Sequence, residues 1–202
     1  NPKITLIREG IALAKQEQVD IILAIGGGSV IDSAKGIALG VANGKDSVQM
    51  LRENILPTKR FPLAVVLTIA SAGSEMSSSH VVTDPDTHLK RGLNHDSLRP
   101  DFAFMNPELT YTVSPYQTAC GIVDTMMHTL ERYFTTDSDT ELTDRIAEAV
   151  FVSVKNAGWQ VMRNPEDSEG RATLMWASSL SHNGLTGCGR TAQAQRRLGK
   201  TR

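Results

Sequence analysis

The chain has 202 residues, 40% of them hydrophobic, which is enough for one large domain or parts of two and excludes a disulfide-dependent miniprotein. Its 21 Lys and Arg residues almost balance its 22 Asp and Glu residues, and the formal net charge is -1. Because this balance supplies no bulk attraction to nucleic acid or to an anionic membrane, we expect a small-molecule partner and neither of those two.

The two cysteines, Cys120 and Cys188, lack Cys-x-x-Cys spacing, which favours reduced thiols over a disulfide or a metal pair. No apolar run has the length that crosses a bilayer, and residues 1–3 lack the pattern of a secretory signal. We therefore expect a soluble, cytoplasmic protein. Because the chain starts at Asn-Pro without an initiating Met, we also expect that residues upstream are missing.

Residues 1–110 show the alternating pattern of an α/β domain. Apolar residues at helical spacing predict a helix over 2–18, and the nearly unbroken apolar run 20–25 predicts a strand buried on both faces of a parallel sheet. A glycine turn and a helix over 30–40 complete a strand, turn and helix unit. The further elements predicted in this part are a short helix around 48–51 and strands over 62–67, 80–83 and 102–105, with a polar loop over 84–100.

After Asn106 the pattern becomes helical. Ser114 supplies an N-cap and Pro115 a first-turn proline, and helices are predicted from there to Phe134, over 140–162 and over 167–185. The sequence therefore predicts an α/β part followed by an all-helical part, with the boundary near Asn106 to Ser114.

Gly26, Gly27 and Gly28 separate the predicted strand from the next helix. A glycine turn at the carboxyl end of a strand exposes backbone N–H groups and lets a phosphate approach closely, so this turn predicts a pyrophosphate site. Ser29 could cap the helix or donate to a phosphate oxygen, and Asp32 is expected to reach a ribose, a nicotinamide amide or a neighbouring loop. A tight turn without a ligand is the alternative.

Asp124 and His128 are four residues apart in a helical segment, which stacks both side chains on one face. Neighbours such as Val123 and Met127 make the surroundings largely apolar, so the pair must find partners in each other or in a cation. A carboxylate oxygen and an imidazole suit a divalent first-row metal such as iron or zinc. The alternative is an Asp–His hydrogen bond on the helix surface.

Three segments occur along the chain in an order that is more specific for a protein family than any one segment alone. They are residues 20–35 (DIILAIGGGSVIDSAK), 68–75 (TIASAGSE) and 121–133 (GIVDTMMHTLERY). They resemble the pyrophosphate segment, the cofactor loop and the metal helix of the iron-dependent alcohol dehydrogenases, especially the butanol-dehydrogenase-like and aldehyde-reducing branch. The resemblance extends from Asn1 to about Gly189. It implies part of a Rossmann-like α/β dinucleotide-binding domain over 1–110, incomplete at its N-terminus. Part of an all-α metal-binding domain would follow over 111–189, incomplete at its C-terminus, and then an atypical tail over 190–202. Substrate and metal would lie in the cleft between the two domains.

The resemblance also implies which residues bind the cofactor. Gly27, Gly28 and Ser29 would contact the pyrophosphate, and Thr68 would lie beside the nicotinamide end. Lys90 occupies the position of a family lysine near the cofactor, although a solvated lysine in a polar loop is the alternative. The cofactor would be NAD or NADP, and the sequence leaves that choice open.

By the same resemblance, Asp124 and His128 would be the first two ligands of Fe²⁺ or Zn²⁺ and would act on the substrate through the metal. The family continues beyond the segment 183–187 into two further histidine ligands, whereas residues 190–202 contain no histidine. His182 matches no family ligand. We therefore expect a truncated or frame-shifted sequence with little or no dehydrogenase activity as it stands.

A second departure from the family pattern is Ala72, which stands where the family often has Thr and removes one hydroxyl from the cofactor loop. The remaining histidines, His80, His88 and His95, lie in the α/β part and are expected to be solvated or structural.

The sequence thus predicts a metal-dependent, NAD(P)-linked alcohol dehydrogenase or aldehyde reductase that acts on a primary alcohol or aldehyde. Two alternatives stay open: a glycerol-dehydrogenase-like or dehydroquinate-synthase-like member of the same superfamily, and a non-catalytic remnant. The sequence leaves the oligomeric state open, with a homodimer as one candidate.

Overall fold

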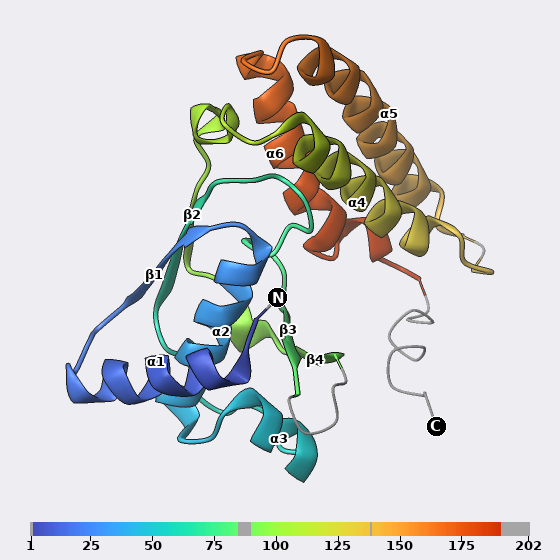
Figure 1. The fold of residues 1–202 in the computed structure, drawn as a ribbon. Helices are drawn as coiled ribbons and strands as arrows, with labels where there is room; N and C mark the ends of the chain where they lie inside the picture. Colours follow the sequence, from blue (N-terminus) through green and yellow to red (C-terminus); the bar gives the residue numbers. More distant parts are fainter. Residues whose placement is uncertain (1, 85–89, 138, 191–202) are drawn as a thin grey trace. The chain divides into compact units, whose positions relative to one another are not determined.

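Helices and strands both occur up to Phe104, and every later described element is helical, in a computed structural model that describes residues 2–84, 90–137 and 139–190. This order confirms the predicted fold class, an α/β part followed by an all-helical part (Figure 1). The chain divides into two units. The first comprises Asn1–Val66 and Ser77–Phe104, and the second comprises Leu67–Met76 and Met105–Arg202.

The described part of the first unit contains three α-helices and two small sheets. Its helices are α1 (Ile4–Gln16), α2 (Gly28–Asn43) and α3 (Ser47–Glu53), and its strands are β1 (Ile22–Gly26), β2 (Leu63–Leu67), β3 (Ser79–Thr83), β4 (Lys90–Asn94) and β5 (Phe102–Phe104). One sheet has the order β1-β2-β5, with β2 and β5 parallel, and β3 and β4 form an antiparallel pair. The predicted helices and strands up to residue 83 are therefore present.

Strand β1 is not buried on both faces, so that prediction is wrong. Ala24 is 2% exposed, but its neighbours Leu23 and Ile25 are 53% and 61% exposed. On β5, Phe102 and Phe104 are also largely exposed. The reason is that side chains alternate between the two faces of a strand, and within the described residues only the Ala24 face of β1 is covered.

The predicted polar loop over 84–100 is also corrected, because Lys90–Asn94 forms strand β4 and pairs with β3. Only Leu93 of this strand is buried, so its polar sequence hid the strand pattern. His95 follows it, and its side chain accepts a hydrogen bond from Ser97 N at the start of a 3₁₀ turn. His88 lies outside the described residues.

The second unit is built around three helices, α4 (Pro115–Tyr133), α5 (Glu141–Arg163) and α6 (Ser168–His182). Short 3₁₀ turns, Pro107–Thr110 and Leu185–Gly187, flank them. Ser114 accepts a hydrogen bond from Gln117 N, as its predicted capping role requires. The core of this unit is formed by α5 and α6, and the partly buried side chains packed against it include Ala70 and Ile122. Its buried members are Val150, Val154, Ala157, Val161, Leu174 and Ala177.

The segment Leu67–Met76 belongs to the helical unit although it directly follows the strands of the first. Its close approach to α4 depends on Gly121. A Cβ atom at Gly121 would lie 2.2 Å from the carbonyl oxygen of Ala70, a distance that real Cβ contacts do not reach. The absence of a side chain at Gly121 therefore lets the backbone of this segment touch the helix.

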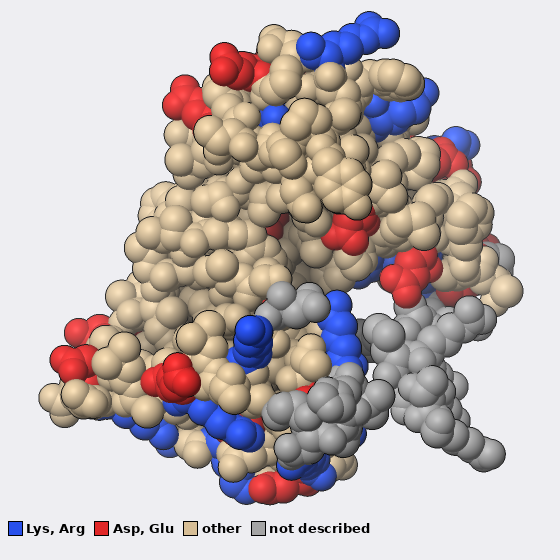
Figure 2. All heavy atoms as spheres, in the orientation of Figure 1, with Lys and Arg blue, Asp and Glu red and all other residues tan. Residues whose placement is uncertain are grey.

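The surface has the mixed charge that the composition predicts. On the face drawn in Figure 2, Lys and Arg side chains are interspersed with Asp and Glu side chains. Cys120 and Cys188 are free, exposed thiols. Among the described residues, we find no helix with the length and apolar character needed to cross a bilayer.

Candidate functional sites in the two units

The glycine turn of the first unit joins β1 to α2. Strand β1 ends at Gly26, Gly27 is the N-cap of α2, and the N–H groups of Val30 and Ile31 both donate to the Gly27 carbonyl oxygen. The first-turn amide groups of Gly28 and Ser29 have no acceptor within the helix. Two backbone donors at the positive end of a helix are thus available to an anion.

Ser29 does not cap the helix, which corrects one of its two predicted roles. Gly27 holds the N-cap position without a side-chain hydrogen bond, and Ser29 lies in the first turn, where its carbonyl accepts from the Ser33 hydroxyl. Ser29 is exposed, and its other predicted role, donation to a phosphate oxygen, stays a prediction. The space beside the turn is open as well, because a Cβ at Gly28 would meet no heavy atom within 4 Å.

Asp32 binds strand β3, a partner that was not among the three predicted, which were a ribose, a nicotinamide amide and a neighbouring loop. Its carboxylate accepts a hydrogen bond from Val81 N at 3.1 Å, and its carbonyl oxygen lies 2.7 Å from His80 Nδ1. Because a carbonyl can only accept, His80 carries a proton on Nδ1, and its Nε2 accepts from the Ser47 hydroxyl at 2.8 Å. These bonds tie α2 and α3 to β3.

His80 is fully buried, so of its two predicted roles the structural one holds. Burial lowers the pKa of His80, and the nearby Asp32 carboxylate opposes this effect only in part. The ring is therefore neutral at neutral pH.

Lys35 also joins α2 to residues 77–79 by hydrogen bonds, which the sequence did not predict. Its side chain is fully buried in α2, and its Nζ donates to the carbonyl oxygens of Ser77 and Ser79 at 2.9 Å and 2.8 Å, and to the Ser77 hydroxyl at 3.1 Å. The buried charge is thus surrounded by acceptors. Helix α2, which carries the glycine turn, is held to residues 77–81 by charged and polar side chains.

The other two predicted cofactor residues lie in different units. Thr68 directly follows β2 and is half-buried in the segment of the second unit. Lys90 is exposed at the start of β4, opposite Thr83, in the first unit.

The predicted metal pair lies on α4 of the second unit. Asp124 Oδ1 and His128 Nε2 are 3.7 Å apart, and their side chains are 43% and 24% exposed. Val123 and Met127 are each 56% exposed, so the surroundings are less apolar than predicted. The two side chains do stack on one helix face, as their spacing predicts.

Two neighbouring groups orient this pair. The Ser71 hydroxyl donates to Asp124 Oδ2 at 2.7 Å, and Thr125 next to it donates to the Ser71 carbonyl oxygen at 2.9 Å. The His182 ring meets the His128 ring edge-on, with centroids 4.4 Å apart. In the sequence, Ser71 was noted only as part of the cofactor-loop segment 68–75, and His182 only as a histidine that matches no family ligand.

The donor set fits a divalent metal in part. Donors that share a tetrahedral ion at about 2.1 Å are about 3.4 Å from each other, close to the separation of Asp124 and His128. Burial lowers the pKa of His128, although Asp124 opposes this, so the ring is neutral and able to bind a metal. Within the described ranges, no group of three or more His, Cys, Asp or Glu side chains is arranged to hold a metal. The pair therefore supplies two ligands.

Fold and sequence comparisons agree on the class of protein. The fold is a Rossmann-like α/β part followed by a helical part. A family model described as iron-containing alcohol dehydrogenase matches residues 1–107. The chain belongs to the iron-containing alcohol dehydrogenase family.

The relatives come from the branch that the motifs resemble. NADH-dependent butanol dehydrogenase A of Clostridium acetobutylicum is 42% identical over 190 residues, which are 94% of this chain and 49% of that protein. The NADPH-dependent aldehyde reductase YqhD of Escherichia coli is 34% identical over 195 residues, or 94% of this chain and 50% of that protein.

A solved structure agrees with these matches. The crystal structure of NADH-dependent butanol dehydrogenase A from Thermotoga maritima matches with a TM-score of 0.90 at 34% identity, covering 95% of this chain and 48% of that one. The chain thus spans about half the length of the relatives it matches.

Proposed function

We propose that this chain belongs to an oxidoreductase that transfers a hydride between NAD or NADP and a primary alcohol or aldehyde, with the help of a divalent metal, Fe²⁺ or Zn²⁺. Family membership and the similarity to butanol dehydrogenases and an aldehyde reductase support this reaction. The exposed free thiols of Cys120 and Cys188 fit a reducing compartment such as the cytoplasm.

The nucleotide would bind at the N-terminus of α2. Gly27, Gly28 and Ser29 would bind its pyrophosphate, since the first-turn amides have no helical acceptor and the space beside Gly28 is open. Asp32 would position this turn through its bond to Val81 N rather than bind the nucleotide directly.

Thr68 and Lys90 remain proposed cofactor residues on the motif resemblance alone. Thr68 would contribute near the nicotinamide and Lys90 near the cofactor phosphates or ribose.

Asp124 and His128 would hold the metal, and Ser71 would orient the Asp124 carboxylate. A bound divalent metal acts as a Lewis acid that stabilises negative charge on the substrate oxygen. Because burial lowers the pKa of His128, its neutral ring offers a lone pair to a metal without the loss of a proton.

The observation that carries this proposal is the distance of 3.7 Å between Asp124 Oδ1 and His128 Nε2, which is close to the separation of two ligands of one metal ion. Titration of the metal-free chain with Zn²⁺, followed calorimetrically, should show binding that Asp124→Asn and His128→Ala each weaken by about 10-fold or more. A matched control is the pair Asp96→Asn and His95→Ala, which removes the same chemical groups from a turn of the first unit. Equal Zn²⁺ affinity in all these variants would refute the metal site.

Turnover tests the reaction separately. With metal, NADH or NADPH and butanal, the absorbance of the reduced cofactor reports hydride transfer. Any turnover should require added metal and disappear in His128→Ala. Metal-independent turnover would contradict the proposed role of the pair.

A further inference from the structure

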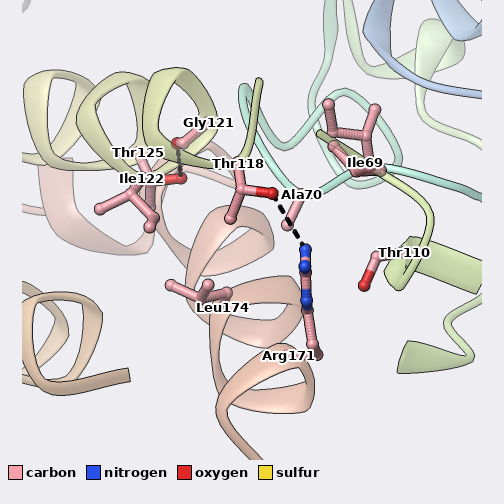
Figure 3. A pocket seen from close by; sticks show the side chains of 10 residues that line it. Ile69, Ala70, Thr110, Thr118, Gly121, Ile122, Thr125, Arg171 and Leu174 are labelled. Atoms are coloured by element: carbon pink, nitrogen blue, oxygen red, sulfur yellow. Dashed lines mark hydrogen bonds between the residues drawn. The ribbon is translucent and has the colours of Figure 1, made fainter. Parts of the chain in front are cut away.

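Arginine side chains join α4 to α6 near both ends of this helix pair, within the second unit. Near the start of both helices, the buried Arg171 of α6 donates from Nη1 to the Thr118 hydroxyl oxygen of α4 at 3.2 Å (Figure 3). Near the end of both helices, Arg132 of α4 donates from Nη1 to the Ser181 carbonyl oxygen of α6 at 2.9 Å. The proposed reaction uses neither arginine.

Arg132 also holds the backbone of a candidate metal ligand. Its Nη1 group donates to the His128 carbonyl oxygen, one turn earlier on α4, at 2.7 Å. One cationic nitrogen therefore bridges the main chain at His128 and the main chain at Ser181. Ser181 directly precedes His182, whose ring is perpendicular to the His128 ring with centroids 4.4 Å apart. Arg132 thus fixes the two backbone positions from which these rings project.

The surroundings of Arg132 favour this bridge. Ser181 lies in the last turn of α6, where carbonyl groups lack donors within the helix and the negative end of the helix dipole attracts a cation. Arg132 is half-buried, and burial lowers its pKa, yet a guanidinium remains charged in proteins. The turn Leu185–Gly187 packs on its stem, because a Cβ at Gly187 would lie 3.4 Å from Arg132 Cδ. The side chain is therefore held at its tip and along its length.

The ring contact restricts how the His128 side chain can turn. A histidine ring rotates broadly about its χ2 angle unless neighbouring groups restrain it. In the structure His128 Nε2 lies 3.7 Å from Asp124 Oδ1, with the His182 ring packed against the imidazole from α6. The restraint on His128 thus comes from another helix, as the restraint on Asp124 comes from Ser71.

We propose that Arg132 is a positioning residue for the Asp124 and His128 pair: it keeps His182 against His128 and thereby aims the His128 ring at Asp124. In this role Arg132 contacts neither metal nor substrate and acts through two backbone carbonyl groups. The inference rests on the proposed metal-binding function of the pair. Its consequence is that α6 affects metal affinity without contributing a ligand.

Calorimetric titration of the metal-free chain with Zn²⁺ tests this role. Arg132→Met keeps an unbranched stem but removes the donors, and His182→Ala removes the ring. Each should weaken Zn²⁺ binding by about 3- to 10-fold, the effect expected from the loss of one edge-on ring contact. Since Arg132→Met could also disturb folding, the His182 variants test the same path without it. His182→Phe keeps a ring at this position and should bind Zn²⁺ as the unchanged chain does.

Thr118→Val is the matched control, because it breaks the arginine bond at the other end of the same helix pair and preserves the side-chain volume. It should lower the melting temperature without changing the Zn²⁺ affinity. The double variant Arg132→Met with His182→Ala should bind Zn²⁺ no more weakly than the weaker single variant, because both changes interrupt one path.

NMR spectra of the metal-free chain report the orientation of the His128 ring without any metal. Nuclear Overhauser cross-peaks between the His128 ring protons and the Asp124 methylene protons should be strong in the unchanged chain and in Thr118→Val. They should be weak in Arg132→Met and in His182→Ala. A chain with this pattern of cross-peaks that binds no Zn²⁺ would refute the proposed function and support the positioning role.

Four outcomes would overturn the proposal. The first is unchanged Zn²⁺ affinity and unchanged cross-peaks in a folded Arg132→Met or His182→Ala variant. The second is a loss of affinity in Thr118→Val equal to that in Arg132→Met. The third is a loss in His182→Phe as large as that in His182→Ala, and the fourth is additive losses in the double variant.

Discussion

Replacing Gly28 by Ala separates nucleotide binding from folding in the first unit. The added methyl group would meet no heavy atom within 4 Å, and Gly28 is the first residue of α2, so the fold has no steric reason to resist the change. Ala is favoured over Gly in helices by up to about 1 kcal/mol, with less at the first position. The free energy of unfolding should therefore stay constant or rise slightly.

The affinity of the Gly28→Ala variant for the nucleotide cofactor, by contrast, should fall. If the pyrophosphate lies against this turn, the methyl group occupies the space through which phosphate oxygens reach the amide groups. Loss of one hydrogen bond to a charged group costs about 1.5–3 kcal/mol, which corresponds to a roughly 10- to 150-fold weaker affinity for NADH or NADPH. Calorimetric titration of both cofactors, beside thermal melts of the same samples, measures the two effects.

Gly92→Ala is the control, because its new Cβ would make only ordinary contacts, the nearest at 3.9 Å, in strand β4 of the same unit. It should bind the cofactor as the unchanged chain does. If the chain binds a cofactor and Gly28→Ala binds it equally well, the pyrophosphate does not lie at this turn and the reasoning fails.

Three further predictions concern packing, pH and metal binding. Gly121→Ala should lower the free energy of unfolding by about 1–2 kcal/mol in urea melts. The added Cβ would lie 2.2 Å from a backbone oxygen, and this overpacking outweighs the gain in helix propensity. An unchanged midpoint of unfolding would contradict the close contact. Because the folded-state pKa of His80 lies below its ordinary value of 6.5, its contribution to stability should be complete above about pH 6.5 and decline at lower pH. His80→Gln should flatten that pH dependence, and an equally steep profile would exclude His80 as its source. Ser71→Ala should weaken Zn²⁺ binding about 10-fold, because the Asp124 carboxylate loses the hydrogen bond that orients it. The control Ser33→Ala removes a hydroxyl in the first unit and should leave Zn²⁺ affinity unchanged. Equal Zn²⁺ affinity in the two variants would show that Ser71 does not orient the ligand.

Local signals in the sequence predicted the helices well. The pattern of Ser114 and Pro115 located the start of α4, and the four-residue spacing of Asp124 and His128 put both on one face of it. These features depend on residues close in sequence, namely helical periodicity and capping side chains. They were therefore predictable before any tertiary contact was known.

The wrong predictions concern strands β1 and β4, whose burial and pairing depend on residues outside the strand itself. Strand β4 has one buried residue, Leu93, and exists because β3 supplies its hydrogen-bond partners. The exposure of Leu23 and Ile25 depends on which elements cover β1, and the apolar run itself cannot show that. Strand pairing and burial are properties of the assembled chain.

The sequence by itself determined the family, the fold class, the glycine turn and the candidate metal pair, because each follows from short motifs and their order. Only the tertiary structure decided that Ser71 bonds Asp124, that Asp32 and Lys35 hold residues 77–81, and that the buried Arg171 donates to Thr118. These contacts join residues more than 40 positions apart in the sequence. Their energies arise from desolvation and hydrogen bonding across the folded chain, which periodicity along the sequence does not encode.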